Sequence, residues 1–187
     1  MTKRGFSLIE TMVVLGISVA ALVALVNLFL MFNAIYGYQQ AFIASAGSAG
    51  TTMNALEAAI LPADQVLASH AFSGDAYTSS ATTLVLELPS IDSSGALIVG
   101  AKDYVAFYAS GASFFRRTEA AEGSMRVSGV KTLSTTVSSI SFTYDSADFT
   151  KVTNITTDLK MQATFKQQTM QSHLSGQWYL RNRQPSP

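Results

Sequence analysis

The chain contains no cysteine, so it can form no disulfide framework, no thiolate metal site and no cysteine nucleophile. Charge is scarce as well: 13% of the 187 residues are charged, and 12 basic residues balance 12 acidic ones. A nucleic-acid-binding protein would carry a basic stripe or excess, and a disordered chain would combine high net charge with low hydrophobicity. Because 48% of the residues are hydrophobic, we expect a folded chain with no nucleic-acid partner.

Sequence motifs of common enzymes and cofactor-binding proteins are also missing. The two histidines, His70 and His173, lack the spacing of a helical metal site. The sequence has no Gly-x-Ser-x-Gly nucleophile elbow and no glycine-rich phosphate-binding loop. Asp145 and Asp148 could offer oxygen ligands to calcium, but aspartates at this spacing are more typical of a turn. We therefore expect a protein that is not an enzyme and that has no cofactor and no metal.

One long segment carries no charge. No Asp, Glu, Lys, Arg or His occurs in residues 11–56, and residues 12–36 are apolar almost throughout. About 20 apolar residues suffice to cross a bilayer as a helix. Lys3 and Arg4 precede the segment. The positive-inside rule therefore predicts a single pass through the lipid of the cytoplasmic membrane, with the N-terminus inside and the C-terminal part outside.

Two interpretations of this segment use only its length and composition. A secretory signal peptide has an apolar core of about 7–15 residues before a small-residue cleavage site. Residues 44–46 (ASA) could be such a site, releasing a secreted domain cut near Ala46, but they lie far beyond such a core. A membrane anchor for a monomeric extracytoplasmic binding domain fits the length. It leaves Glu10 unexplained, unless this carboxylate only faces water at the level of the lipid headgroups.

A third interpretation uses the whole N-terminal string. Residues 3–10 read KRGFSLIE and are followed directly by the apolar segment. In this order of basic residues, glycine, aromatic residue, carboxylate and apolar span, the chain resembles type IV pilin-like proteins. The resemblance implies that a prepilin peptidase cuts after Gly5 and that Phe6 is then N-methylated. It also implies that Glu10 forms an assembly salt bridge with the Phe6 amine of a neighbouring subunit.

The same resemblance implies the role and partners of the protein. It would be a structural subunit of a type IV pilus-like or type II secretion-like filament at the cell surface. It would join other pilin-like subunits, with the help of an inner-membrane assembly platform and a separate ATPase. Residues 140–145 (ISFTYD) and 180–183 (LRNR) resemble the larger minor pilins and minor pseudopilins. Many bacterial pilins carry a kinking proline in the apolar helix; Asn27 holds that place here, so a straighter helix is expected.

The helical pattern continues beyond the apolar segment. Apolar side chains recur at steps of three, four or seven residues, as on one face of an α-helix: Tyr38, Phe42, Ala49, Met53, Leu56 and Ile60. Ser45 and Ser48 lie off this face. Gly47 and Gly50 weaken one turn, where the helix could bend or break. Pro62 provides a stop, so we expect the helix to end just before it and to pack on the domain that follows.

The remaining residues are expected to form a β-rich domain. Apolar, β-prone or alternating runs predict strands over residues 82–88, 104–109, 113–118, 137–144, 159–165 and 177–180. Residues 110–112 predict a hairpin turn between the second and third of these strands. Arg116 and Arg117 form a short charged run, which is more typical of a solvated hairpin edge than of a phosphate site.

These patterns together predict an α+β fold, in which a long N-terminal helix packs on an antiparallel sheet as in the pilin-like proteins. Four parts are expected along the chain. Residues 1–5 would be the leader peptide, 6–36 the membrane-spanning and filament-core helix, 37–61 its amphipathic continuation, and 62–187 the globular head.

Overall fold

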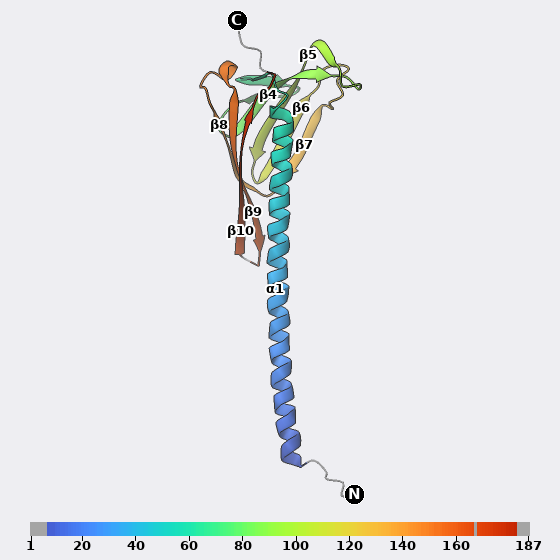
Figure 1. The fold of residues 1–187 in the computed structure, drawn as a ribbon, viewed down its shortest axis with the longest axis vertical. Coiled ribbons are helices and arrows are strands. Elements are labelled where there is room, and N and C mark those ends of the chain that lie inside the picture. The colour runs from blue at the N-terminus through green and yellow to red at the C-terminus, as the bar shows by residue number, and fades with distance from the viewer. Residues whose placement is uncertain (1–6, 167, 183–187) are drawn as a thin grey trace. The chain divides into compact units, whose positions relative to one another are not determined.

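Figure 1 shows the computed structural model, which describes residues 7–166 and 168–182. Helix α1 spans Leu8–Ile60 and the 3-10 helix η1 spans Phe149–Lys151. The strands are β1 (Gln65–Val66), β2 (Ser69–Phe72), β3 (Asp75–Thr78), β4 (Thr83–Ile91), β5 (Leu97–Ser110), β6 (Ser113–Glu119), β7 (Gly129–Ser134), β8 (Val137–Tyr144), β9 (Asn154–Phe165) and β10 (Gln168–Tyr179). The chain divides into two compact units, residues 1–41 and 42–187.

Helix α1 is uninterrupted over its whole length, including the turn that contains Gly47 and Gly50. The hydroxyl of Thr51 lies within hydrogen-bond distance of the carbonyls of Gly47 (3.1 Å) and Ser48 (3.0 Å). Local hydroxyl bonding and the packing of the neighbouring residues keep this weak turn helical. The helix ends at Ile60, which confirms the stop predicted from the following proline.

The part of α1 in the second unit has one buried face. Its buried residues are Ser45, Ala49, Thr52, Met53, Leu56, Ala59 and Ile60, so the last four apolar positions of the predicted stripe are confirmed. The prediction for Phe42 is wrong, because its side chain is exposed. Ser45 is buried instead, with its hydroxyl 3.0 Å from that of Ser172 on β10. Ser48 similarly donates to Ser134 on β7 at 3.0 Å. Paired hydroxyls therefore let polar helix residues pack against strands.

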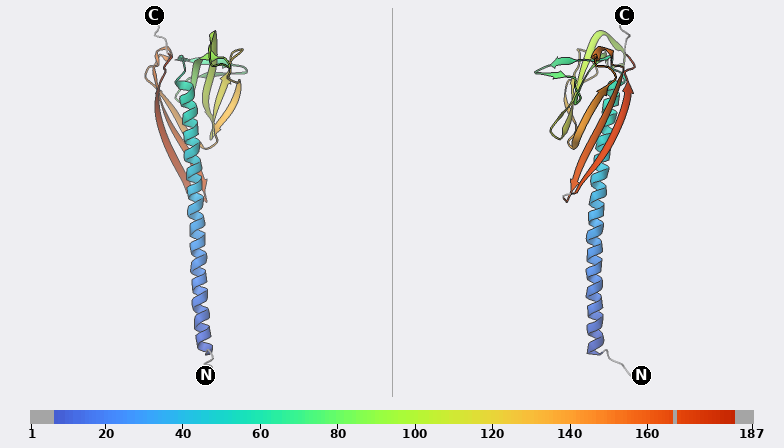
Figure 2. Two further views of the ribbon diagram at one scale, coloured as in Figure 1. Left: turned by 45° about the vertical axis from the view of Figure 1, so that its right-hand side comes forward. Right: turned by 90° about the vertical axis from the view of Figure 1, so that its left-hand side faces the viewer.

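The described residues of the second unit form three antiparallel sheets. Their strand orders are β1-β4-β5-β6-β7, β10-β9-β8 and β2-β3. Figures 1 and 2 show the five-stranded and three-stranded sheets flanking the part of α1 that belongs to this unit. Buried residues of α1 join one hydrophobic core with side chains from both of these sheets. The predicted α+β class, with a helix packed on antiparallel sheet, is confirmed.

The predicted strands are all present, but several are longer than expected. The β8 bounds agree with the prediction, whereas β4 runs through Pro89 to Ile91. The chain tolerates this proline within a strand because a register shift separates Pro89 from Ile91. Strands β1, β2, β3 and β7 were not predicted, since they are short or mostly exposed and lack an apolar alternation.

Strand β4 is covered on both faces. Leu84 and Leu86 point to the main core beneath α1, while Val85 points the other way and packs with Phe72 of β2 and Ala106 of β5. The β2-β3 hairpin therefore covers the outer face of the five-stranded sheet. This double covering explains why three consecutive residues of β4 are fully buried.

A glycine on β10 allows close contact with the helix. A Cβ atom built at Gly176 would lie 2.6 Å from Cζ2 of Trp178 and 2.8 Å from Cε of Met53 on α1. The Met53 methyl can move, but the Trp178 ring is rigid and packs against the core. A strand-interior glycine thus marks the place where a neighbouring element approaches closely.

We expect Gly176→Ala to lower the free energy of unfolding by about 1–3 kcal/mol, because an added methyl group overpacks this contact. Urea unfolding of the whole chain in detergent, followed by Trp178 fluorescence, would measure the change. Gly47→Ala is a matched control, since an added Cβ there has no atom within 4 Å and alanine is the better helix former. Equal stability of the Gly176→Ala and unmodified chains would show that the contact relaxes without cost.

Candidate assembly interface

The first unit presents an apolar helical surface. From Leu8 to Phe32 every large apolar side chain of α1 is exposed, and these residues lie on all sides of the helix. The helix is long and apolar enough to span a membrane, and no residue of its most apolar stretch is buried within the protein. A surface of this kind cannot remain in water without aggregating. It must be covered by lipid or by other apolar helices, which is consistent with a single-pass membrane protein.

Two hydroxyl side chains near the start of α1, those of Thr11 and Ser18, form hydrogen bonds to the backbone. The Thr11 hydroxyl lies 2.9 Å from the carbonyl of Leu8 and 3.1 Å from that of Ser7, and the Ser18 hydroxyl donates to the carbonyl of Val14 at 2.8 Å. Hydroxyl groups bonded to a preceding turn need no water. These residues are therefore compatible with an apolar environment, in which an unsatisfied polar group is costly.

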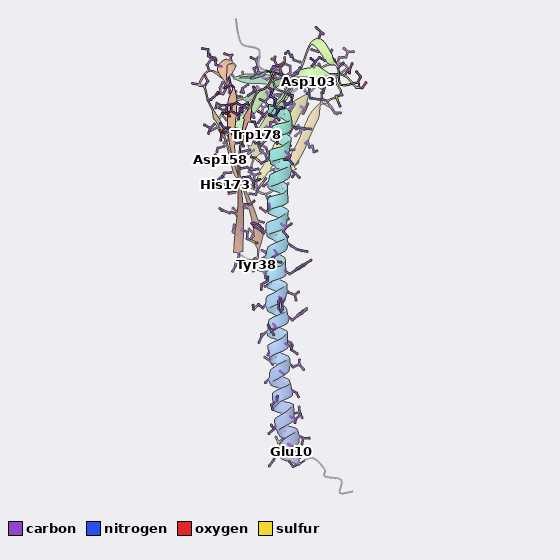
Figure 3. All side chains as sticks on the ribbon, in the orientation of Figure 1. Glu10, Tyr38, Asp103, Asp158, His173 and Trp178 are labelled. Carbon is purple, nitrogen blue, oxygen red and sulfur yellow. The ribbon has the colours of Figure 1, made fainter. Side chains whose placement is uncertain are left out.

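Glu10 forms a reciprocal cap at the start of α1. Its Oε2 accepts hydrogen bonds from the Ser7 N–H (2.9 Å) and hydroxyl (3.1 Å), and the Glu10 N–H donates to the Ser7 hydroxyl at 3.2 Å. This is a capping box, whose signature Ser-x-x-Glu is readable in the sequence but was missed there. Figure 3 shows Glu10 in the first turn of the helix. Its Oε1 accepts no hydrogen bond from a described residue, so one carboxylate oxygen can still bind a donor.

The other predicted site residues, Gly5 and Phe6, lie outside the described residues, and so does the predicted leader. Of the predicted site residues, the structure therefore locates Glu10 alone, and its pairing with Phe6 stays a prediction. The expected division of the helix at residues 36 and 37 is likewise not tested, while the compact units themselves meet between residues 41 and 42.

The two histidines each face one carboxylate. The Nε2 atom of His70 lies 2.9 Å from Glu119, and that of His173 lies 3.1 Å from Asp158 on the adjacent strand (Figure 3). Within residues 7–166 and 168–182, no group of three or more His, Cys, Asp or Glu residues could hold a metal ion. Each histidine is thus within hydrogen-bond distance of a single carboxylate, and neither is near Glu10 in the sequence or shares its unit.

The two aspartates weighed as calcium ligands instead organise a loop. Asp145 accepts a hydrogen bond from the Thr153 N–H at 3.0 Å and another from the Thr153 hydroxyl. Asp148 caps η1 by accepting from the Thr150 N–H at 3.1 Å and its hydroxyl at 2.6 Å. Bonding to the Thr150 hydroxyl and to Lys151 lowers the pKa of Asp148. The turn interpretation of both residues is confirmed.

A buried carboxylate was missed by the sequence analysis. Asp103 on β5 is fully buried. Its Oδ1 accepts from the Ser90 hydroxyl (2.6 Å) and the Ala121 N–H (2.8 Å), and its Oδ2 accepts from the Ser124 hydroxyl (2.7 Å) and Arg126 Nη1 (2.6 Å). Burial by itself raises the pKa of Asp103, but the four hydrogen bonds outweigh it and lower the pKa.

The Asp103 network holds the loop between β6 and β7 against the neighbouring strands. Its donors come from β4 and from this loop, which includes Arg126. Arg126 also donates to the Pro89 carbonyl at 2.7 Å. The sequence contains a signal for this buried network. Asp103 lies in the same alternating register of β5 as Val105 and Phe107, and both of these apolar residues are buried. A carboxylate in the inward register of a strand indicates a buried, paired group.

Comparison with protein-family models, with curated proteins and with solved structures found no match to this chain. Its resemblance to a known family therefore rests on the N-terminal string and on the fold. A long N-terminal apolar helix packed on antiparallel sheet is compatible with a pilin-like fold.

Proposed function

We propose that this protein is a structural subunit, a minor pilin or minor pseudopilin, of a type IV pilus-like or type II secretion-like filament. The observation that carries the proposal is an uninterrupted helix that begins within the string KRGFSLIE and whose first part exposes apolar residues on every side. Such a surface is stable in the cytoplasmic membrane, and it is equally well covered by identical helices packed in a filament.

Assembly moves the helix from lipid into a bundle of helices. This transfer gains little hydrophobic free energy, because lipid chains are as apolar as the side chains that replace them. Close packing and polar pairing must therefore supply the specificity, and an external ATPase must supply the work of extraction. The proposed partners are other pilin-like subunits, the prepilin peptidase, and an inner-membrane platform with its own ATPase.

Glu10 is the residue proposed to select the register. After cleavage, Phe6 carries a free amine, and the Glu10 Oε1 accepts no bond from the described residues of its own chain. In a low-dielectric bundle an unpaired carboxylate is costly, while pairing with an ammonium group of a neighbouring subunit removes much of that cost. The pair forms only when adjacent helices are offset so that the two groups meet.

A second candidate function is that of a membrane-anchored monomer with an extracytoplasmic binding domain. The capping box favours it, because Glu10 then has a local role at the helix N-terminus and needs no partner subunit. This anchor would never be cut by a prepilin peptidase.

Intact-mass analysis of the protein purified from its native host separates these functions. A chain that begins at Phe6 and carries one added methyl group supports the filament subunit. An uncut chain that begins at Met1 contradicts it and supports the anchor. A chain that begins near Gly47 would contradict both and indicate a secreted domain.

A further inference from the structure

A small cleft lies between the C-terminal end of α1 and the inner face of the five-stranded sheet. Its volume is about 330 Å³, within the range of small-molecule sites. Ala59, Leu88 and Val105 provide apolar walls, and Arg116 and Arg126 provide the charged groups. All of these residues belong to the second unit, so the cleft does not depend on the membrane segment or on filament assembly.

Among the described residues, the Arg116 side chain has no ion-pair partner, and its Nε atom is buried without a hydrogen bond. The next residue, Arg117, faces the opposite side of the sheet, where it pairs with Asp75 at 2.6 Å and also donates to the Ser73 carbonyl. The expectation of a solvated arginine pair is thus wrong, because strand alternation sends the two side chains into different environments.

Neighbouring groups leave the charge of Arg116 uncompensated. Asp103, a carboxylate on the neighbouring strand β5, already accepts four hydrogen bonds and is paired with Arg126. The residue opposite Arg116 on β7 is Lys131, another cation. Arg116 is half-buried and lines the cleft. The cleft therefore contains one arginine whose positive charge no described residue compensates.

We propose that this cleft binds a small monocarboxylate with a branched aliphatic body. The planar guanidinium fork of Arg116 matches a carboxylate, and the single unpaired charge fits a monoanion better than a dianionic phosphate. The apolar walls would cover the aliphatic part, and the exposed side chains of Met125 and Val127, which also line the cleft, would add apolar contact. The ligand is either a free organic acid or the C-terminal residue of a polypeptide, since both present the same carboxylate next to the same apolar group.

The test is an NMR titration of the whole chain in detergent micelles, with ¹⁵N-labelled arginine, using isovalerate as the probe. Saturable shifts of the Arg116 Nε–H signal are expected, with a dissociation constant of about 10 mM or below for so small a ligand. Isovaleramide has the same shape without the charge and should bind at least about tenfold more weakly. Acetyl-leucine tests the polypeptide source: tighter binding than isovalerate assigns the site to a C-terminus, and weaker binding assigns it to a free acid.

Arg116→Gln is expected to weaken isovalerate binding at least about tenfold, because the charged fork is lost. Lys131→Gln removes a charge from the adjacent exposed position and should change it less than about twofold, because exposed charges are screened. Equal binding of isovalerate and isovaleramide by the unmodified chain would overturn the proposal even if the Arg116 variant failed to fold. Tighter binding of inorganic phosphate than of isovalerate would also overturn it.

Discussion

Glu10→Gln is expected to leave the protein processed and inserted in the membrane but to lower its incorporation into filaments at least about tenfold, which corresponds to about 1.4 kcal/mol. Glutamine can replace glutamate in a capping box, so the start of α1 is preserved. The negative charge is lost, and the Phe6 amine of the neighbouring subunit then has no ionic partner in an apolar bundle. The measurement is the amount of mature protein in sheared filaments relative to that in membranes.

Two further variants separate assembly from capping. Glu10→Val removes both the charge and the cap, and it should fail to incorporate to the same degree as Glu10→Gln. Ser7→Ala removes the serine of the capping box and should lower helix stability by about 1 kcal/mol. It keeps the Glu10 carboxylate, so this variant should incorporate nearly normally. If Glu10→Gln joined filaments at the normal level while Ser7→Ala did not, Glu10 would be a cap alone. The membrane-anchor function would then be favoured.

Asp103→Ala is expected to lower the free energy of unfolding by about 3–5 kcal/mol, because it removes a buried acceptor of four hydrogen bonds and leaves the half-buried Arg126 guanidinium without its carboxylate. The donors Ser90, Ser124 and the Ala121 N–H lose an acceptor at the same time. Urea unfolding of the whole chain in detergent would measure the loss. Asp158→Asn is a matched control, since it breaks an exposed pair with His173 that is worth about 0–1 kcal/mol.

The contribution of Asp103 to the stability of the fold should also depend on pH, and it should decrease at low pH. The pKa of Asp103 is lower in the folded protein than its ordinary value of 3.8. Its stabilising contribution is therefore complete at pH values above the unfolded pKa and is lost as the pH falls below about 4 toward the folded pKa. The difference in stability between the unmodified chain and Asp103→Asn should shrink over this range. A difference that stayed constant with pH would show that Asp103 acts through shape and not through charge.

Patterns within single elements could be predicted from the sequence. The end of α1 follows from Pro62, and the bounds of β8 follow from a run whose apolar residues alternate with Ser141 and Thr143. These features depend on local propensity and on the period of one element, which neighbours along the chain determine. The β2-β3 hairpin could not be predicted in the same way, because its residues become a strand pair only by packing on the outer face of β4 and β5.

Polar residues were the least predictable part of the head. Ser45 was placed off the apolar face of the helix, yet it is buried because Ser172 lies opposite and supplies a hydroxyl partner. The same reason applies to Asp103, whose burial depends on donors from a distant loop. Burying a polar group is favourable or costly according to its partners, and partners far apart in the chain are brought together only by folding.

The sequence by itself determined that this chain has a charge-free apolar helix, preceded by basic residues and Glu10, and a β-rich domain after Pro62. Composition and the spacing of apolar residues suffice for these conclusions. Composition reflects the preference of each side chain for water or an apolar environment, and the spacing reflects the backbone repeat of a helix or strand. The tertiary structure alone decided the roles of polar side chains in the head: Asp103 is buried among donors from β4 and a distant loop, and Arg116 lines a cleft without a described partner while Arg117 is paired. Adjacent arginines have the same chemistry in a sequence, but a strand sends them to opposite faces, where different neighbours set the cost of each charge.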